Sequence, residues 1–336
     1  MQLDKPLEVK IELTQNCNLG CSFCFNAGRP KASSELGKMH LKKVLQRIAD
    51  EGIESVRFTG GEPLLREGII PLLSFAKGLG LHVKLNTNAT LIDKSNASSL
   101  AENVDDFLVS MHAFDAESER KLCASPYFEK KLEAVELLAS QGCFLRAATI
   151  LARQNIAQLE KGHALISSMP FSQWVLLRPI PNIVECSPLG SSDVATAVEK
   201  LLRFNEGKPD GEKFFIENAL PFCSYNPEKV EQVALGGIYE DGHSSLAVDS
   251  KGIVKPSYFI DVALGNALKD SFFECWNSPF MQRLRSLDFV PGECRGCRHL
   301  MKCKAGSRFS ALFVNNSFSA LDPLAMPGKY ALALFH

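Results

Sequence analysis

The sequence predicts an α/β fold in which six parallel strands alternate with helices and form a partial (β/α)6 barrel of the TIM type. Short runs rich in β-branched and aromatic residues alternate with amphipathic stretches over the first 215 residues, and glycines such as Gly52 and Gly80 end two of these stretches. The polar motifs follow the expected strands directly, which is where parallel β/α barrels carry their chemistry.

The expected elements follow in chain order. The strands are 9–13, 55–63, 82–90, 106–114, 144–151 and 173–180. The helices between them are 39–52, 69–80, 95–104, 128–142 and 155–169. After about residue 215 the pattern changes to a β-hairpin over 244–260 and a short helix over 278–287. We therefore expect two domains, a barrel over residues 1–215 and a small, loop-rich module over residues 216–336.

The composition is that of an ordinary globular protein. Of the 336 residues, 46% are hydrophobic and 22% are charged, and the formal net charge is −1. A charge this close to neutral gives no reason to expect nucleic acid or an anionic membrane as a partner. No apolar run reaches the roughly 18 residues that span a bilayer, and the start of the chain lacks the pattern of a signal peptide. The expected location is the cytoplasm.

Six of the eleven cysteines fall in two tight clusters. In a reducing compartment such clusters are typical of metal ligands and not of disulfides. The clusters are Cys17, Cys21, Cys24 and Cys294, Cys297, Cys303. The scattered cysteines are expected to be small buried hydrophobic residues, namely Cys123, Cys143, Cys186, Cys223 and Cys275.

The first cluster supplies three thiolates from one short loop after the first strand. An iron–sulfur cubane normally takes four cysteine ligands, so three leave one iron open to bind a further molecule. A zinc knuckle is the alternative, but zinc needs a fourth Cys or His and none falls in this loop. The pattern Cys17-x3-Cys21-x2-Cys24 therefore favours an iron–sulfur cluster with an open site.

The segment from Cys17 to Asn26 resembles the signature loop of the radical S-adenosylmethionine (SAM) superfamily, and Thr59–Pro63 resembles its GGEP motif. The resemblance implies that a [4Fe–4S] cluster on Cys17, Cys21 and Cys24 binds S-adenosylmethionine and cleaves it reductively. The resulting 5′-deoxyadenosyl radical would abstract a hydrogen from the substrate. The enzyme would need a reductant such as flavodoxin or ferredoxin. Residues implied to bind the methionine ammonium are Gly60, Gly61, Glu62 and Pro63.

Weaker matches follow the later strands. The resemblance implies that they contact the ribose and carboxylate of the cofactor, although turn or capping polarity explains each of them about as well. These residues are Asn86, Asn88, Ser110, Arg146 and Asn155. His112 is expected to be a satisfied histidine at a strand end, in preference to a catalytic one.

The second cluster, Cys294-x2-Cys297-x5-Cys303, resembles the SPASM/twitch modules that follow many radical SAM barrels. Positions that carry further ligand cysteines in that pattern hold Ser257, Ser307 and Ala325 here, and one falls near Tyr239. The resemblance thus implies one remaining auxiliary [4Fe–4S] cluster on three cysteines. Its fourth position is either open to substrate or closed by Cys223 or Cys275. A structural zinc site completed by His299 or another cysteine is the alternative, and an empty vestigial site is a third.

The SPASM-like end resembles maturases of ribosomally made peptides. The implied substrate is therefore a peptide or protein that is crosslinked, epimerised or excised. Because the first strand begins near residue 9, a leader-recognition domain would be a separate protein. Cys223 is a candidate hydrogen donor to the substrate radical, with an inert buried thiol as the alternative. The other functions considered are action on a small molecule in cofactor biosynthesis and non-catalytic metal binding.

Overall fold

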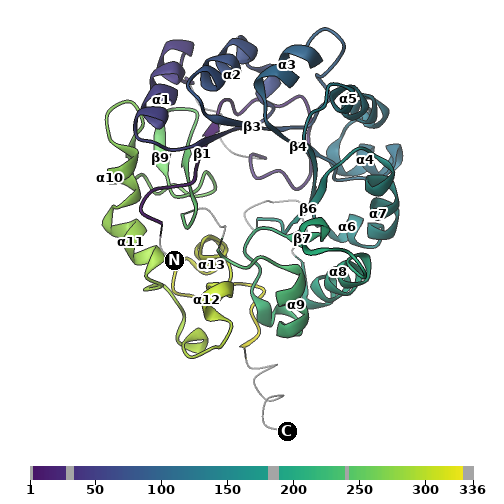
Figure 1. The fold of residues 1–336 in the computed structure, drawn as a ribbon. Coiled ribbons are helices and arrows are strands. Elements are labelled where there is room, and N and C mark those ends of the chain that lie inside the picture. The colour runs from purple at the N-terminus through teal and green to yellow at the C-terminus, as the bar shows by residue number, and fades with distance from the viewer. Residues whose placement is uncertain (1–2, 28–33, 181–188, 239–241, 328–336) are drawn as a thin grey trace.

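The computed structural model describes residues 3–27, 34–180, 189–238 and 242–327. Within them, one ten-stranded sheet has the order β10-β9-β8-β1-β2-β3-β4-β5-β6-β7 and curves around a central space, with helices outside it (Figure 1). The six predicted strands are confirmed as parallel neighbours, and the edge strands β7 and β10 do not pair with each other, so the barrel is partial. The strands are β1 (Glu8–Glu12), β2 (Ser55–Thr59), β3 (His82–Thr87), β4 (Asp106–Ser110), β5 (Leu145–Ile150), β6 (Gln173–Leu177), β7 (Phe215–Ile216), β8 (Ser245–Val248), β9 (Ile253–Lys255) and β10 (Gly265–Asn266).

The helices of the first half are α1 (Lys38–Asp50), α2 (Ile69–Gly78), α3 (Ala97–Asn103), α4 (Ala116–Cys123), α5 (Phe128–Ser140), α6 (Arg153–Ile156), α7 (Leu159–Ser168) and α8 (Ser191–Phe204). Those of the second half are α9 (Pro227–Val233), α10 (Phe272–Trp276), α11 (Pro279–Arg285), α12 (Leu300–Cys303) and α13 (Arg308–Asn315). Short 3₁₀ turns are η1 (Pro63–Leu65), η2 (Asp210–Glu212), η3 (Phe222–Ser224) and η4 (Gly292–Cys294). No helix in the described ranges is long and apolar enough to cross a bilayer.

Two helices of the barrel were absent from the sequence prediction. Helix α4 is short and highly charged, and Asp115 caps it by accepting a hydrogen bond from the Ser118 amide at 2.7 Å. Helix α8 buries Val194, Ala197, Val198 and Leu201, the spacing of an amphipathic helix. The predicted helix over 155–169 is divided into α6 and α7. The sequence therefore predicted the six strands of the barrel correctly but missed two of its helices.

The predicted hairpin forms and extends the barrel sheet. Strand β8 pairs in parallel with β1, for example Glu8 with Ser245, and then turns back to pair with β9 in antiparallel fashion. The sheet therefore runs on beyond residue 215, where β7 begins. The division into two domains at that residue stays a prediction.

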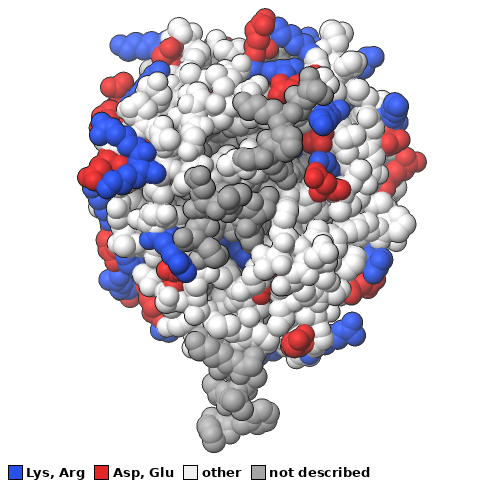
Figure 2. All heavy atoms as spheres, turned by 180° about the vertical axis from the view of Figure 1, so that it is seen from behind, with Lys and Arg blue, Asp and Glu red and all other residues white. Residues whose placement is uncertain are grey.

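The core lies between the sheet and the outer helices. On β1, Val9 and Ile11 are fully buried with residues of α1, whereas Glu8 and Glu12 alternate with them and so point to the inner face. Over the face seen in Figure 2, acidic and basic side chains are interspersed around the rim. This fits the near-neutral net charge of the sequence.

Candidate functional site

The loops after β1 and β2 are joined by backbone hydrogen bonds. Three bonds connect them in register: Leu13 N to Thr59 O (2.9 Å), Gly61 N to Thr14 O (2.7 Å) and Glu62 N to Asn16 O (2.8 Å). Because Asn16 directly precedes Cys17, the GGEP turn lies against the start of the cysteine loop. The two motifs that the sequence separates by about forty residues therefore form one surface.

Both glycines of this turn are needed for that close approach. Gly60 has φ +141°, and a Cβ there would lie 2.3 Å from the Thr14 carbonyl oxygen. A Cβ on Gly61 would lie 2.0 Å from the Asn16 carbonyl oxygen. No side chain fits at either position without separating the two loops.

Glu62 is fully buried beneath the turn. Its Oε1 accepts hydrogen bonds from Leu64 N at 3.0 Å and Thr87 Oγ1 at 2.9 Å. Its Oε2 accepts one from Asn88 N at 2.7 Å. Burial raises the pKa of Glu62 to about 6, against the lowering effect of these donors. The carboxylate thus fastens the GGEP turn to the end of β3.

The cysteine loop presents its thiols beside this turn. Cys17 is exposed, and its Sγ accepts hydrogen bonds from Leu19 N at 3.4 Å and Asn88 Nδ2 at 3.8 Å. Burial raises the pKa of Cys17, and the nearby charges of Glu62, Cys21 and Cys24 raise it further. The three predicted ligands, Glu62 and Asn88 are therefore neighbours.

Cys123 is a partner of this loop that the sequence did not reveal. It ends α4, it is fully buried, and its thiol is hydrogen-bonded to Cys21. This bond lowers the pKa of Cys21 and raises that of Cys123. Because a cluster ligand is a thiolate, Cys123 is the donor when Cys21 holds the cluster. The backbone of the same segment accepts bonds from Gly20 N at 3.2 Å and Ser22 N at 2.9 Å. The end of α4 therefore supports the whole cysteine loop.

These residues fit an iron–sulfur cluster with a bound organic ligand. The loop offers three thiols, and the buried Oδ1 of Asn26 has no hydrogen-bond partner among the described residues. Phe23 is buried against His112, with ring centroids 4.6 Å apart, and shields one side from water. In the described part of the chain no three His, Cys, Asp or Glu side chains converge on a single metal ion. The ligands of a cubane attach to different irons and are spaced more widely.

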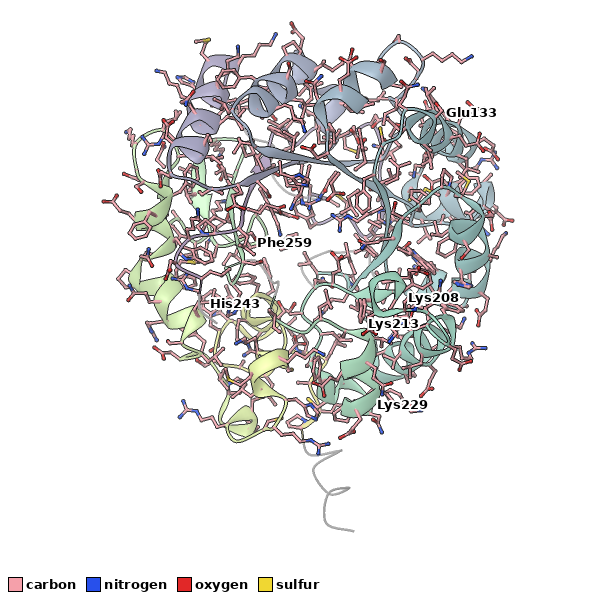
Figure 3. All side chains as sticks on the ribbon, viewed as in Figure 1. Glu133, Lys208, Lys213, Lys229, His243 and Phe259 are labelled. Carbon is pink, nitrogen blue, oxygen red and sulfur yellow. The ribbon has the colours of Figure 1, made fainter. Side chains whose placement is uncertain are left out.

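An aromatic group connects the cysteine loop to the C-terminal half. The ring of Phe25 lies 5.2 Å from that of Tyr258 and 5.0 Å from that of Phe259. Figure 3 shows Phe259 on the inner side of the ring of helices. The residues just after β9 therefore cover the loop on a second side.

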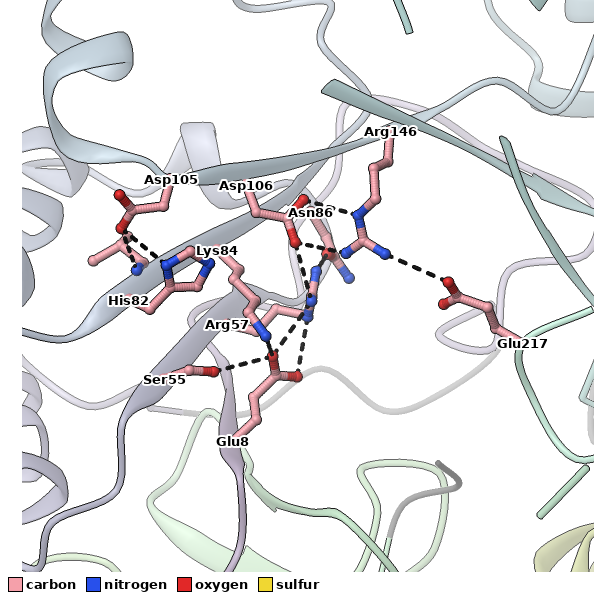
Figure 4. A network of polar contacts seen from close by, with 11 residues as sticks. Glu8, Ser55, Arg57, His82, Lys84, Asn86, Asp105, Asp106, Arg146 and Glu217 are labelled. Atoms are coloured by element: carbon pink, nitrogen blue, oxygen red, sulfur yellow. Dashed lines mark hydrogen bonds and ion pairs between the residues drawn. The ribbon is translucent and has the colours of Figure 1, made fainter. Parts of the chain in front are cut away.

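Two predicted cofactor residues lie in a charged network inside the barrel (Figure 4). Asn86 Oδ1 accepts a hydrogen bond from Arg57 Nη1 at 3.0 Å. Arg146 donates to Asp106 at 2.9 and 2.6 Å and lies near the amino end of β5. The cofactor motifs lie at the carboxyl ends of the strands. The structure thus brings Asn88 to the cysteine loop, whereas Asn86 and Arg146 pair with other side chains.

The same network joins the first strands. Glu8 binds Arg57 at 3.1 Å and Lys84 at 2.7 Å. Burial would raise the pKa of Glu8, but these two cations and Lys10 hold it well below its usual range. Buried charges that are paired in this way brace the strands against one another.

Asn155 is fully buried and is hydrogen-bonded to backbone atoms. Its Nδ2 donates to Ile150 O at 2.8 Å and His112 O at 3.0 Å, and its Oδ1 accepts from Ala152 N at 2.8 Å. His112 Nδ1 accepts from Ile150 N at 3.1 Å, and burial lowers the pKa of His112 to about 3. His112 is thus the satisfied histidine that the sequence favoured. Ser110 contributes its carbonyl oxygen to Lys131 Nζ at 3.5 Å.

The second cysteine group lies in the C-terminal half, with Cys294 and Cys303 buried and Cys297 exposed. Burial raises the pKa of Cys294 to about 11 and that of Cys303 to about 12. Ser307, at a position where the resemblance places a cysteine, caps α13 by accepting from Ser310 N at 3.2 Å. Cys186 and the position near Tyr239 lie outside the described residues.

Two family models match the chain. Residues 11–161 match the radical SAM superfamily, and residues 240–298 match an iron–sulfur cluster-binding domain, SPASM. The first match contains the cysteine loop and the GGEP turn. The second contains the hairpin, Cys294 and Cys297.

Individual proteins match over nearly the whole chain. The PqqA peptide cyclase of Gluconobacter oxydans is 25% identical over 97% of this chain and 92% of its own length. The AdoMet-dependent heme synthase of Oleidesulfovibrio alaskensis is 24% identical over 93% of this chain and 85% of its own. The structure of Streptococcus suis SuiB bound to precursor peptide SuiA has a TM-score of 0.79 at 19% identity, covering 97% of this chain and 77% of SuiB. The last likeness is one of fold.

Proposed function

The chain belongs to the radical SAM superfamily and carries a SPASM iron–sulfur domain, and from this premise we propose that it is a maturase that modifies a peptide. The observation that carries the proposal is the joined surface of the three-cysteine loop and the GGEP turn. Near full-length similarity to a PqqA peptide cyclase supports the choice of a peptide. The modification is a crosslink, an epimerisation or an excision.

We propose the following roles for the residues of the chain. A cluster with bound S-adenosylmethionine would supply one-electron reductive chemistry and, from it, the radical that removes a hydrogen from the substrate. Cys17, Cys21 and Cys24 hold the cluster. The carbonyls of Gly60 and Gly61 receive the methionine ammonium, and the negative charge of Glu62 beneath the turn favours it. Pro63 is the first residue of η1, and its fixed backbone angle φ restricts the conformation of the turn.

Water must be kept from the reacting groups. Phe23 with His112 closes one side of the cysteine loop, and Phe25 with Tyr258 and Phe259 closes another. Reduction requires a partner such as flavodoxin or ferredoxin, and a separate protein binds the peptide's leader. Both belong to the proposal.

A second candidate is a small substrate in cofactor biosynthesis. It is favoured by the similarity to the AdoMet-dependent heme synthase, which extends over 93% of the chain. The two candidates share the same radical generation and differ only in what occupies the barrel.

The test uses anaerobically reconstituted full-length protein with dithionite and S-adenosylmethionine. We expect short peptides encoded beside the gene to increase 5′-deoxyadenosine formation and to change in mass or hydrogen content. A loss of two mass units identifies a crosslink, uptake of solvent deuterium identifies epimerisation, and a shortened peptide identifies excision. Cys21→Ala should abolish turnover, whereas Cys143→Ala, a cysteine in neither cluster, should preserve it.

Turnover that responds to a tetrapyrrole and to none of the peptides would replace the peptide proposal with the small-molecule one. An absence of 5′-deoxyadenosine from a fully loaded cluster would overturn both.

A further inference from the structure

The auxiliary cysteine group contains a fourth thiol from a distant part of the chain. Cys223 lies in η3, and Phe222 beside it donates its backbone N–H to Cys303 Sγ at 3.4 Å. The Phe222 ring lies 5.8 Å from the His299 ring, and Lys302 Nζ is 5.7 Å from its centroid. Turn η3 therefore packs directly on α12.

Electrostatic effects between the thiols agree with this packing. Burial raises the pKa of Cys223, and Cys297 is among the neighbours that raise it further. Burial raises the pKa of Cys294 and of Cys303, and the nearby Cys223 raises both further. These effects agree with the contact between Phe222 and Cys303, which brings η3 beside the motif.

The last described segment of the chain reaches the same place. The Met326 backbone N–H is hydrogen-bonded to the Cys223 thiol. Met326 directly follows Ala325, which stands where the resemblance would put the final cysteine of the module. Cys223 therefore lies beside the position that has lost its thiol.

The other candidates for a fourth ligand are engaged elsewhere. The Cys275 thiol donates to Leu264 O at 3.7 Å, and the charges around it are Asp270, Glu51 and Glu274. His299 uses both ring nitrogens, with Nδ1 3.0 Å from Glu231 and Nε2 accepting from Arg298 Nε at 3.1 Å.

We propose that Cys223 is the fourth ligand of an auxiliary [4Fe–4S] cluster held by Cys294, Cys297 and Cys303. The inference rests on the iron–sulfur assignment of the proposed function and adds that this cluster has no open iron. A cubane with four thiolates does not bind substrate directly. Cys223 is then a metal ligand and not a hydrogen donor to the substrate radical.

The test isolates the auxiliary cluster by replacing Cys17, Cys21 and Cys24 together with alanine in the full chain. This variant should keep about four iron atoms per chain. Mild oxidation with ferricyanide should leave it without the electron paramagnetic resonance (EPR) signal of a [3Fe–4S] cluster. An iron with an open position would be lost in that treatment. A strong [3Fe–4S] signal from this variant, which still contains Cys223, would therefore overturn the proposal.

A second comparison adds Cys223→Ser or Cys275→Ser to that background. We expect Cys223→Ser to yield the [3Fe–4S] signal on oxidation, or to lose at least half of the iron. Cys275→Ser should match the background variant. Identical spectra and iron content for Cys223→Ser and the background would overturn the proposal. Because these readouts need no substrate, failure of the peptide proposal would leave them unchanged.

Discussion

Cys21 and Cys123 show how one neighbouring side chain tunes a cluster ligand. The Cys123 thiol donates a hydrogen bond to the Cys21 sulfur from the end of α4. Hydrogen bonds to cluster sulfurs favour the reduced state, because the added electron increases the negative charge on sulfur. Cys123 is therefore a positioning residue whose effect should appear in the reduction potential.

We expect Cys123→Ala to lower the reduction potential of the SAM-binding cluster. The change should be on the order of 1 kcal/mol in the free energy of reduction, about the net value of one hydrogen bond. An EPR-monitored titration of a variant lacking Cys294, Cys297 and Cys303 measures this cluster alone. Cys143→Ala is the matched control and should leave the potential unchanged. An equal potential in both variants would show that the Cys123 thiol does not act on Cys21.

At the scale of elements, the loops after β1 and β2 depend on each other. Their contact is made by backbone atoms, so it requires residues without a side chain at Gly60 and Gly61. The loop after β3 joins them through Glu62 and Asn88. The ends of three strands therefore hold the cysteine loop in one conformation. The glycine pair is the part of this arrangement that tolerates no added side chain.

Gly61→Ala tests this dependence. The new Cβ would lie 2.0 Å from Asn16 O and should force the loops apart, so the SAM-binding cluster should be lost or bound at well below half occupancy. Gly78→Ala is the control, because a Cβ at this helical residue meets nothing within 4 Å. It should keep full iron content and raise stability by about 0.5–1 kcal/mol. Iron analysis and thermal unfolding measure both, and full iron content in Gly61→Ala would contradict the expectation.

The C-terminal part of the chain is anchored to the barrel by strand pairing, by a hydrogen bond and by a buried ion pair. Strand β8 pairs with β1, and Trp276 Nε1 donates to Leu3 O at 3.0 Å. Arg178, just after β6, pairs with Asp322 at 2.7 Å, and both side chains are almost fully buried. These contacts attach the C-terminal part to the first strand and to the residue just after the sixth strand.

Asp322→Ala should destabilise the protein by about 3–5 kcal/mol, because it leaves the Arg178 charge buried without its partner. Replacing both residues, by Arg178→Met and Asp322→Leu, should recover much of that loss. Glu117→Ala removes an exposed pair with Lys121 and should leave the stability almost unchanged. Denaturant unfolding under anaerobic conditions measures all three. A loss for Asp322→Ala no larger than that for Glu117→Ala would show that the buried pair does not anchor the segment.

Local patterns in the sequence were sufficient to predict the six strands β1 to β6, the hairpin and both cysteine groups, but not the two-residue strands β7 and β10. Alternating periodicity and the short spacings between Cys17 and Cys24, and between Cys294 and Cys303, are properties of neighbouring residues. Local patterns also predicted the GGEP turn, and the structure shows why its two glycines are sterically required. The roles of the individual residues as cofactor ligands stay predictions.

Spacing could not separate Asn88 from Asn86, because Asn86 lies within β3 and pairs with Arg57, whereas Asn88 lies just past the end of the strand, beside Cys17. The pairing of Arg146 could not be predicted either, since its partner Asp106 comes from another strand. Helix α4 was missed because its short, charged sequence depends on a cap and on packing.

The sequence by itself determined the β/α alternation and the three-cysteine loop, because both are encoded by residues close together in the chain. Only the tertiary structure decided that Cys123 supports Cys21 and that Cys223 joins the second cysteine group. Each of these pairs is separated by many residues of chain, and only the curvature of the sheet and the packing of α4 and η3 bring them together.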